Sequence, residues 1–300
     1  MMKPFTLTCF ETPNTDRGVG LALMIETPGG KTWLYDSGCG YPAAGGGWEG
    51  NFNAGRDIIG PFLKEKGISK LDGIIASHAH YDHFGGFLWL VDQFPIDMLI
   101  DSGFDFSGAM DANYSKELAD YTALRKRFQA KMNAYRAVIA GDRLAIDDAL
   151  SIEIIAPPKG FFPDPHPEKR PPNDPASHYL LNSNAVILKI THGNVSFLLG
   201  GDIEKEDQVD LLLPSVTLGA LKCDVLIAPA HGIHAAKEFA EATRPSTTII
   251  SIYERYVNTN CPGRKVYADA GSNVYATGIH GRISVVSDGT GYSVHTQNSK

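Results

Sequence analysis

The stretch SHAHYDHFGG, residues 77–86, places three histidines and one aspartate within six positions. It follows directly on the short apolar run LDGIIA, residues 71–76, which is typical of a buried β-strand. Imidazole and carboxylate side chains at such close spacing are ligands for zinc, and also for manganese or iron. The pattern therefore predicts a metal site at the end of a strand.

The spacing within this stretch indicates more than one metal position. His78 and His80, two residues apart, can point the same way, whereas Asp82 and His83 lie one turn further along and point to a second place nearby. One metal ion takes three or four protein ligands. Four donors overfill one site and underfill two, so we expect further ligands from elsewhere in the chain.

Two residues at the ends of later apolar strands are candidates for these ligands. Asp202 follows FLLGG, and His231 follows LIAPA and precedes a glycine. A carboxylate can bridge two cations, which an imidazole cannot. The alternative interpretations are an ordinary Gly-Asp turn at Asp202 and a surface cluster of polar residues that binds no metal.

Composition limits the class of protein. The 300 residues carry 27 lysines and arginines against 34 aspartates and glutamates, a net charge of −7. This balance argues against a broad basic surface for nucleic acids, although not against a nuclease whose cation contacts the phosphate. The chain shows no apolar leader, no membrane-length apolar run and no CxxC pair among its four cysteines. These features predict a soluble, cytoplasmic protein without a membrane partner.

The order of predicted elements favours two sheets packed together with helices outside, an α/β (α+β) arrangement. Two segments interrupt that order. Apolar residues at three- and four-residue steps predict one long helix over about 111–140, closed near Gly141. Residues 157–175 hold eight prolines and predict a long loop without regular structure. We expect one domain over residues 1–300.

Taken together, HxHxDH after a strand, an upstream LYDSG (34–38), FLLGGD (197–202) and a late strand ending in His-Gly resemble the metallo-β-lactamase-fold hydrolases. The run NSNAVILKI (182–190) before FLLGGDIE is similar to the hydrolase-like domain of the competence protein ComEC and its stand-alone homologues. The resemblance covers nearly the whole chain. It implies a four-layered αββα sandwich with two divalent metal ions at its edge, Zn²⁺ first, with Mn²⁺ or Fe²⁺ as alternatives.

The resemblance also implies a role for each of these residues. One metal would take His78 and His80, and the other would take Asp82, His83 and His231. Asp202 would bridge the two ions, and Asp36 would hydrogen-bond a ligand imidazole and so fix its tautomer. The alternative interpretation of Asp36 is an ordinary turn residue before Ser-Gly.

The chain departs from the family pattern at three positions. A further family ligand lies about two dozen residues before the bridging aspartate; His178 has that distance, but aligning the following strand puts Leu181 there. The ComEC-like group lacks this ligand as well. Ala230 replaces the first histidine of a common His-His-Gly, and Cys261 stands where relatives have a late histidine. None of these departures removes the core of the predicted site.

Two metal ions can activate a water for hydrolysis, so no serine or cysteine nucleophile is needed. Asp82 and Asp202 are candidates for orienting that water, and His178 for protonating the leaving group. The first expectation is a nuclease or phosphodiesterase that acts on a small molecule, a nucleotide or a nucleic acid. The alternatives are an acyl hydrolase of lactones, β-lactams or thioesters, and a non-catalytic scaffold. A further alternative that the resemblance brings is redox chemistry, since diiron relatives of this fold have Glu in place of the second motif histidine and carry a flavin domain. His80 and the lack of a flavodoxin-like segment disfavour it.

Overall fold

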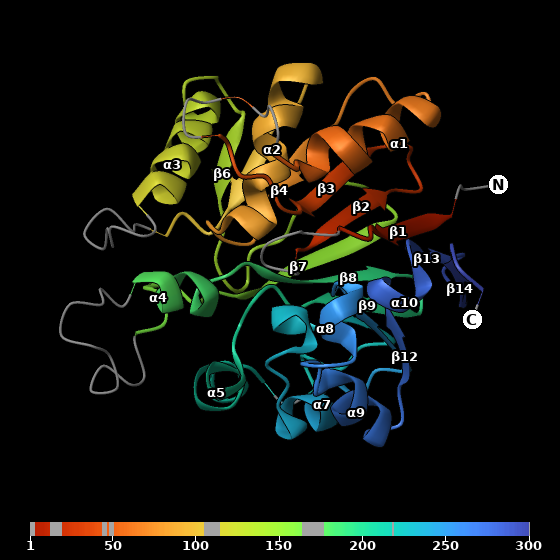
Figure 1. Cartoon of the computed structure of the whole chain (residues 1–300). Coiled ribbons are helices and arrows are strands. Elements are labelled where there is room, and N and C mark those ends of the chain that lie inside the picture. The colour runs from red at the N-terminus through yellow and green to blue at the C-terminus, as the bar shows by residue number, and fades with distance from the viewer. Residues whose placement is uncertain are drawn as a thin grey trace.

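Two β-sheets face one another across the interior, and helices cover the outer face of each (Figure 1). The computed structural model describes residues 4–12, 20–43, 47, 51–104, 115–163, 177–217 and 219–299; for residues 115 and 177–179 it describes the backbone alone.

The first sheet has eight strands and contains both parallel and antiparallel pairs. From edge to edge they are β14 (Tyr292–Thr296), β13 (Ile283–Ser287), β1 (Phe5–Cys9), β2 (Ala22–Glu26), β3 (Thr32–Ser37), β4 (Gly73–Ile75), β5 (Leu99–Asp101) and β6 (Tyr135–Ala137). Strands β3 to β6 are parallel, and the pairs on the other side of β3 are antiparallel. The carboxyl ends of β3, β4 and β5 therefore lie along one edge of this sheet.

The second sheet has six strands and the same mixture of pairings. In order they are β12 (Asn273–Ala276), β11 (Thr247–Ile250), β10 (Val225–Ile227), β9 (Val195–Leu199), β8 (Ile187–His192) and β7 (Leu150–Ala156). Strands β9 to β12 are parallel, whereas β7, β8 and β9 are antiparallel. The carboxyl ends of β9, β10 and β11 thus also share one edge.

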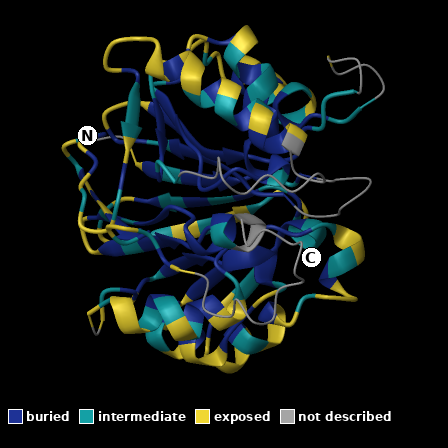
Figure 2. Cartoon of the chain, turned by 90° about the vertical axis from the view of Figure 1, so that its left-hand side faces the viewer, coloured by how far each residue is buried: buried dark blue, intermediate teal, exposed yellow. Residues whose placement is uncertain are grey.

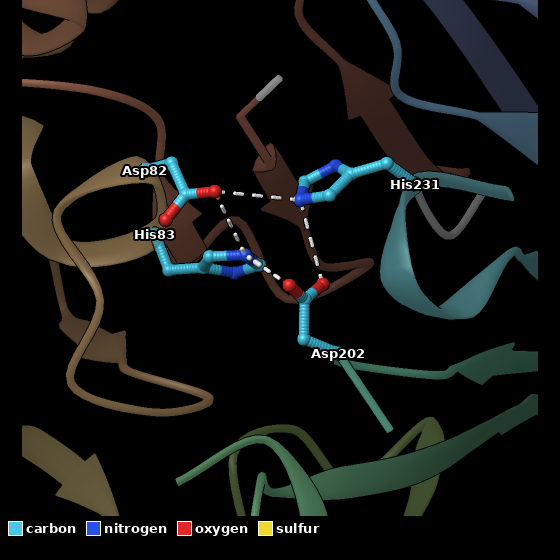
Figure 3. A group of neighbouring side chains, drawn as sticks. All are labelled: Asp82, His83, Asp202 and His231. Atoms are coloured by element: carbon cyan, nitrogen blue, oxygen red, sulfur yellow. Dashed lines mark ion pairs between the residues drawn. The ribbon is translucent and has the colours of Figure 1, made fainter. Parts of the chain in front are cut away.

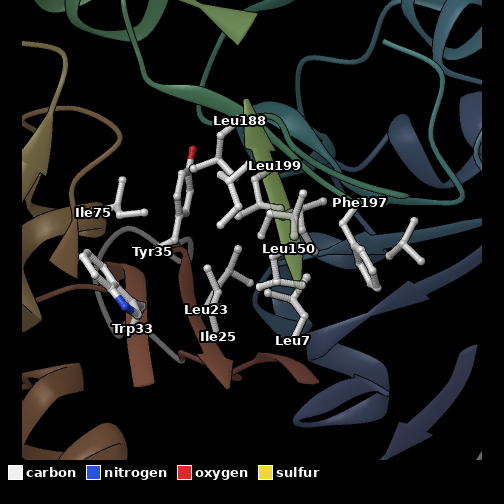
Figure 4. Packing of buried hydrophobic residues seen from close by; sticks show 14 of the residues in the cluster. Leu7, Leu23, Ile25, Trp33, Tyr35, Ile75, Leu150, Leu188, Phe197 and Leu199 are labelled. Atoms are coloured by element: carbon white, nitrogen blue, oxygen red, sulfur yellow. The ribbon is translucent and has the colours of Figure 1, made fainter. Parts of the chain in front are cut away.

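Apolar side chains from both sheets fill the space between them (Figure 4). Leu7, Leu23 and Tyr35 of the first sheet are fully buried together with Leu188 and Phe197 of the second. The two sheets are joined near one edge by a hydrogen bond of 2.6 Å from the Tyr35 hydroxyl to the carbonyl oxygen of residue 186. This core holds the two parallel edges at a fixed separation.

The helices surround the two sheets, and most of them lie on the outer faces (Figures 1 and 2). They are α1 (Gly60–Glu65), α2 (Tyr81–Gln93), α3 (Ser115–Gln129), α4 (Ser177–Ser183), α5 (Lys205–Asp207), α6 (Leu213–Ser215), α7 (Lys237–Thr243), α8 (Glu254–Val257), α9 (Gly263–Asp269) and α10 (Thr277–His280). Turns of π-helix precede α1 and α6. A second apolar cluster packs α1, α2 and α3 on the first sheet, and a third packs α7 and α9 on the second. The predicted four-layered αββα sandwich is confirmed.

The predicted long helix over 111–140 is wrong at its C-terminal end. Helix α3 ends at Gln129, and residues 135–137 form strand β6 beside β5. Asn133 takes a left-handed backbone (φ 59°), which a right-handed helix cannot contain, and Met132 is 91% exposed. The apolar spacing before this point is correct, since Leu118 and Tyr121 are buried. Residues 111–114 lie outside the described ranges.

Most of the proline-rich loop also lies outside the described residues. Its first part, 157–163, is irregular, as predicted, and residues 164–175 are not described. One domain over 1–300 stays a prediction. Within the described ranges, every helix is too short or too polar to cross a lipid bilayer.

Candidate metal centre

The predicted site residues lie at the carboxyl ends of parallel strands from both sheets. Asp36 is the second-to-last residue of β3, and the SHAHYDH stretch follows β4. Asp202 follows β9 and His231 follows β10. Carboxyl ends of parallel strands are where open α/β sheets bind ligands. The sandwich brings two such edges together, so donors distant in sequence meet there.

The histidine motif spans a turn and the first turn of α2. His80 has an extended backbone and precedes the helix, while Asp82 and His83 lie within it. The following glycines let α2 approach the loop after β3, because a Cβ on Gly86 would lie 2.3 Å from the carbonyl oxygen of Ser37. A side chain on Gly85 or on Gly86 would push the helix, and with it His83, away from the sheet edge.

Four side chains converge on one point (Figure 3). The donor atoms of Asp82, His83, Asp202 and His231 all lie within 4.8 Å of one another. Asp202 is central, with one carboxylate oxygen 3.2 Å from His83 Nε2 and the other 3.4 Å from His231 Nε2. Asp82 Oδ2 lies 3.9 Å from His83 Nε2 and 3.7 Å from His231 Nε2. We call these four residues the acidic cluster.

The donor atoms of the acidic cluster fit a metal ion better than they fit one another. Nε2 of His83, Nε2 of His231 and Oδ1 of Asp202 are buried, and none makes a hydrogen bond of good geometry with a described residue. Buried polar atoms are ordinarily paired, and an unpaired one costs about 1–3 kcal/mol. A cation between these atoms would satisfy all three, and nitrogen with carboxylate oxygen is a donor set that zinc accepts.

Each imidazole of the acidic cluster is oriented through its other ring nitrogen. His83 Nδ1 lies 2.7 Å from Asp36 Oδ2, and His231 Nδ1 lies 3.0 Å from the carbonyl oxygen of Ser251. A carboxylate and a carbonyl can only accept, so the network assigns the proton to Nδ1 in both rings. When a metal displaces the second proton of each ring, Nε2 presents a lone pair on the side of Asp202, which is the form that binds a metal.

The other two motif histidines form a separate pair beside this cluster. His78 Nε2 and His80 Nδ1 face one another at 2.8 Å, and the ring centroids of His78 and His83 are 4.2 Å apart. The Ser77 hydroxyl lies 2.7 Å from Asp36 Oδ2 and 2.9 Å from His78 Nδ1. Because it donates to Asp36, it accepts from His78, so Asp36 orients His78 through Ser77 as well as His83 directly.

The charges of the two groups differ. Burial lowers the pKa of His83, but the Asp202 and Asp36 carboxylates outweigh it and hold that pKa well above its usual value. Burial also opposes protonation of His231, yet Asp202 and Asp82 raise its pKa to about 9. His78 behaves in the opposite way, since burial and the neighbouring imidazoles hold its pKa well below the usual range.

The segment that carries His231 has an unusual backbone. Ala230, His231 and Gly232 have φ values of 45°, 54° and 69°, three left-handed residues in succession. Such a backbone costs roughly 1–2 kcal/mol for each residue other than glycine. The Ala230 N–H donates to the carbonyl oxygen of Gly201 at 3.0 Å, which ties this turn to the residue before Asp202.

The structure brings together the six predicted ligands and Asp36. It does not test the predicted role of His178. His178 is in the first turn of α4, and its side chain is outside what the structure describes. Leu181, which takes the family ligand position in the alignment, is 3% exposed in the apolar cluster under α2 and α3. Cys261 lies beside the His231 turn, since a Cβ on Gly232 would be 3.4 Å from its Sγ.

Sequence reasoning missed two residues that orient the imidazoles. Ser77 precedes His78 directly, so its position in the motif was a usable signal. Ser251 follows β11, the parallel neighbour of β10, and acts through its backbone carbonyl. A backbone acceptor places no demand on the residue type, so the sequence carries no signal for it.

Comparison with known proteins places the chain in a family. The profile described as "Metallo-beta-lactamase superfamily" matches residues 15–238, most of the chain. ComE operon protein 3 of Bacillus subtilis (strain 168) is 29% identical over 204 residues. That match covers 67% of this chain and 22% of the relative, so the chain spans only about a fifth of the length of that protein.

Two solved structures have a similar arrangement. One is a metal-dependent hydrolase of the β-lactamase superfamily (TM-score 0.46, 11% identity, covering 91% of this chain and 95% of the other). The second is a diphosphatase from the PhnP family (TM-score 0.47, 13% identity, covering 96% and 99%). At this degree of likeness they say nothing about the substrate of this chain. The profile match, the confirmed sandwich and the converging donors lead to one conclusion: the chain belongs to the metallo-β-lactamase superfamily of metal-dependent hydrolases.

Proposed function

We propose that this chain hydrolyses phosphodiester bonds with two divalent metal ions, Zn²⁺ before Mn²⁺ or Fe²⁺. The observation that carries the proposal is the acidic cluster, four buried or nearly buried donors within 4.8 Å, next to a second pair of imidazoles. The acidic cluster would hold one ion, His78 and His80 would contribute to the other, and Asp202 would serve both. Two divalent ions polarise the substrate and lower the pKa of water towards neutrality.

Two carboxylates of the cluster are suited to orient a water. The neighbouring His83 and His231 outweigh burial and hold the pKa of Asp82 and of Asp202 below the usual range, so both are ionised at neutral pH. The Asp82 side chain is 18% exposed, and the Asp202 side chain is 11% exposed. We infer that Asp82, the more open of the two, accepts a hydrogen bond from the attacking water. Protonation of the leaving group by His178 stays a prediction.

Phosphodiesters suit this site better than acyl compounds for an electrostatic reason. Two cations stabilise both the attacking and the leaving oxygen of an in-line displacement, whereas an acyl group develops charge on one carbonyl oxygen. With two carboxylates in the acidic cluster, an anionic substrate depends on the cations to offset repulsion. Small diesters, nucleotides and nucleic acids are therefore the substrates we propose, and lactones, β-lactams and thioesters are the alternative.

The test is turnover of a chromogenic phosphodiester with added Zn²⁺ or Mn²⁺, beside a β-lactam and a lactone. His80→Ala is the site variant, and Asp224→Asn is the matched control. Asp224 accepts from Ser196 at the opposite edge of the second sheet. We expect diester turnover that is lost in His80→Ala and kept in Asp224→Asn. Turnover of the acyl substrates alone would replace this proposal with the alternative.

A further inference from the structure

Helix α3 contacts Tyr81, a residue that separates two predicted ligands. Tyr81 lies between His80 and Asp82, and two carboxylates of α3 hold it. Glu117 accepts a hydrogen bond from the Tyr81 backbone N–H, and Asp120 Oδ2 lies 2.6 Å from the Tyr81 hydroxyl. Residues three apart share one face of a helix. One face of α3 therefore accepts hydrogen bonds from both the backbone and the side chain of Tyr81.

These two hydrogen bonds from Tyr81 to α3 lie at the start of α2. The first N–H groups of a helix have no partner within the helix, and Glu117 supplies one for Tyr81 from outside. Both Glu117 and Tyr81 are buried, at 4% and 6% exposure. The Tyr81 ring also stacks on Phe84 at 5.2 Å and meets the edge of Tyr41 at 5.1 Å. Tyr81 is thus fixed on several sides.

Helix α3 is itself anchored to the first sheet. Asp101, the last residue of β5, accepts from the Tyr121 hydroxyl at 2.8 Å and from Arg125 Nε at 2.7 Å. The Tyr121 ring also meets the edge of Phe84 on α2 at 4.9 Å. Since β5 is the parallel neighbour of β4, which leads into the histidine motif, α3 links the motif to the sheet edge beside it (Figure 1).

We propose that Glu117 and Asp120 are positioning residues that hold the metal-binding turn through Tyr81. A shift of Tyr81 turns the two peptide groups that lead to His80 and Asp82, so it displaces one donor of the histidine pair and one of the acidic cluster. Outer partners that orient metal ligands typically change metal affinity by about 10–100-fold. The proposal rests on metal binding within the proposed function and does not depend on the substrate.

The same two helices offer a matched control at their other ends. Arg127 of α3 pairs with Asp92 of α2 and donates to the carbonyl oxygen of Val91 at 2.6 Å. This contact joins the helices about ten residues beyond the histidine motif, and its side chains are largely exposed. Removing it loosens the packing of α2 on α3 without touching the metal-binding turn.

The experiment compares Tyr81→Phe, Glu117→Ala, Glu117→Gln and Arg127→Ala with the unchanged protein. The dissociation constant for Zn²⁺ is measured by competition with a chromophoric chelator, and the midpoint of thermal unfolding is measured on the metal-free proteins. We expect Tyr81→Phe and Glu117→Ala to bind Zn²⁺ at least about tenfold more weakly. Glu117→Gln keeps an acceptor oxygen for the Tyr81 N–H and should bind within about twofold of the unchanged protein. Arg127→Ala should lower the midpoint slightly and leave Zn²⁺ affinity unchanged.

Two results would overturn the proposal: unchanged Zn²⁺ affinity in both Tyr81→Phe and Glu117→Ala, or an equal loss of affinity in Arg127→Ala. The second would mean that loose helix packing alone weakens the site. If Glu117→Ala does not fold, Tyr81→Phe decides, because it removes one hydroxyl and keeps the ring. A protein that binds Zn²⁺ as expected but hydrolyses no phosphodiester would refute the proposed substrate and leave this inference intact.

Discussion

The acidic cluster and the histidine pair lie side by side but are built differently. The acidic cluster draws four donors from three segments of the chain, the start of α2 and the ends of β9 and β10. The pair consists of His78 and His80, which are neighbours in sequence and face one another at 2.8 Å. The acidic cluster is assembled by the tertiary fold, and the histidine pair by a single turn.

The histidines of the acidic cluster and those of the pair also differ in charge. Carboxylates surround the histidines of the acidic cluster and raise the pKa of His83 and of His231. Without metal, each of these rings therefore holds a second proton and a positive charge at neutral pH. His78 has its pKa lowered by burial and by other imidazoles, so it stays neutral. A metal must therefore displace protons at the acidic cluster but not at His78. We therefore expect the acidic cluster to bind metal with a strong pH dependence.

Asp202→Ala should have the largest effect, because Asp202 is the residue between both imidazoles of the acidic cluster. Without it, the only carboxylate left in the acidic cluster is that of Asp82, whose Oδ2 lies 3.9 Å from His83 Nε2 and 3.7 Å from His231 Nε2. We expect metal content to fall and turnover to drop by more than about 100-fold, beyond the range typical of outer partners. Metal analysis after dialysis and steady-state assays would measure both. Full metal content with full activity would show that Asp202 is not a ligand.

The metal-free protein should lose stability as pH rises through about 9. The pKa of His231 is about 9 in the folded chain and near 6.5 unfolded, so its contribution is complete below about 6.5 and lost above 9. At about 1.4 kcal/mol per pKa unit, the loss is at most about 3.5 kcal/mol. Asp202 acts oppositely: its lowered pKa contributes stability above about pH 3.8, which is lost on acidification.

Urea unfolding of chelator-treated protein between pH 4 and 10 measures this dependence. The His231→Gln variant should lose part of the decrease between pH 6.5 and 9, because its amide does not titrate. A free energy of unfolding that is constant over that range would show that the carboxylates do not hold a proton on His231. Zn²⁺ affinity should rise with pH over the same interval, as protons leave the ligand rings.

Asp36→Asn should have an intermediate effect on both halves, since Asp36 contacts His83 directly and His78 through Ser77. Asparagine keeps the shape but loses the charge and one acceptor oxygen. We expect Zn²⁺ to bind about 10–100-fold more weakly. A chelator competition titration, with Asp224→Asn as control, would detect it. If affinity stays within twofold, the imidazoles do not need Asp36 for their orientation.

Gly232→Ala should have the smallest effect, confined to the turn that carries His231. Gly232 has φ 69°, and an added Cβ would lie 3.0 Å from Ile250 Cγ2. We expect a loss of about 1–2 kcal/mol in the free energy of unfolding. Gly271→Ala has φ 91° with open space around it, so it isolates the backbone cost from the crowding. Equal losses in the two variants would show that packing against Ile250 contributes nothing.

Several elements could be predicted because they depend on local sequence. The apolar spacing of α3 is visible in the sequence, and Leu118 and Tyr121 are buried as that spacing indicates. Its end was misplaced because apolar residues continue past Asn133, where the backbone turns left-handed and the chain joins the sheet. Local periodicity does not distinguish another helical turn from a short strand whose partner lies 36 residues away in the chain.

The kinds of donor and their places at strand ends can be recognised from the sequence, because a ligand needs a particular side chain and a buried strand needs apolar residues. His78, His80 and Asp82 are visible in one motif for that reason. Which donors meet depends on the three-dimensional fold, since the packing of the two sheets sets the distance between Asp202 and His83. The fold also places the Ser251 carbonyl against His231 Nδ1 and Glu117 of α3 against the Tyr81 N–H. Backbone groups and long-range contacts leave no mark on residue spacing.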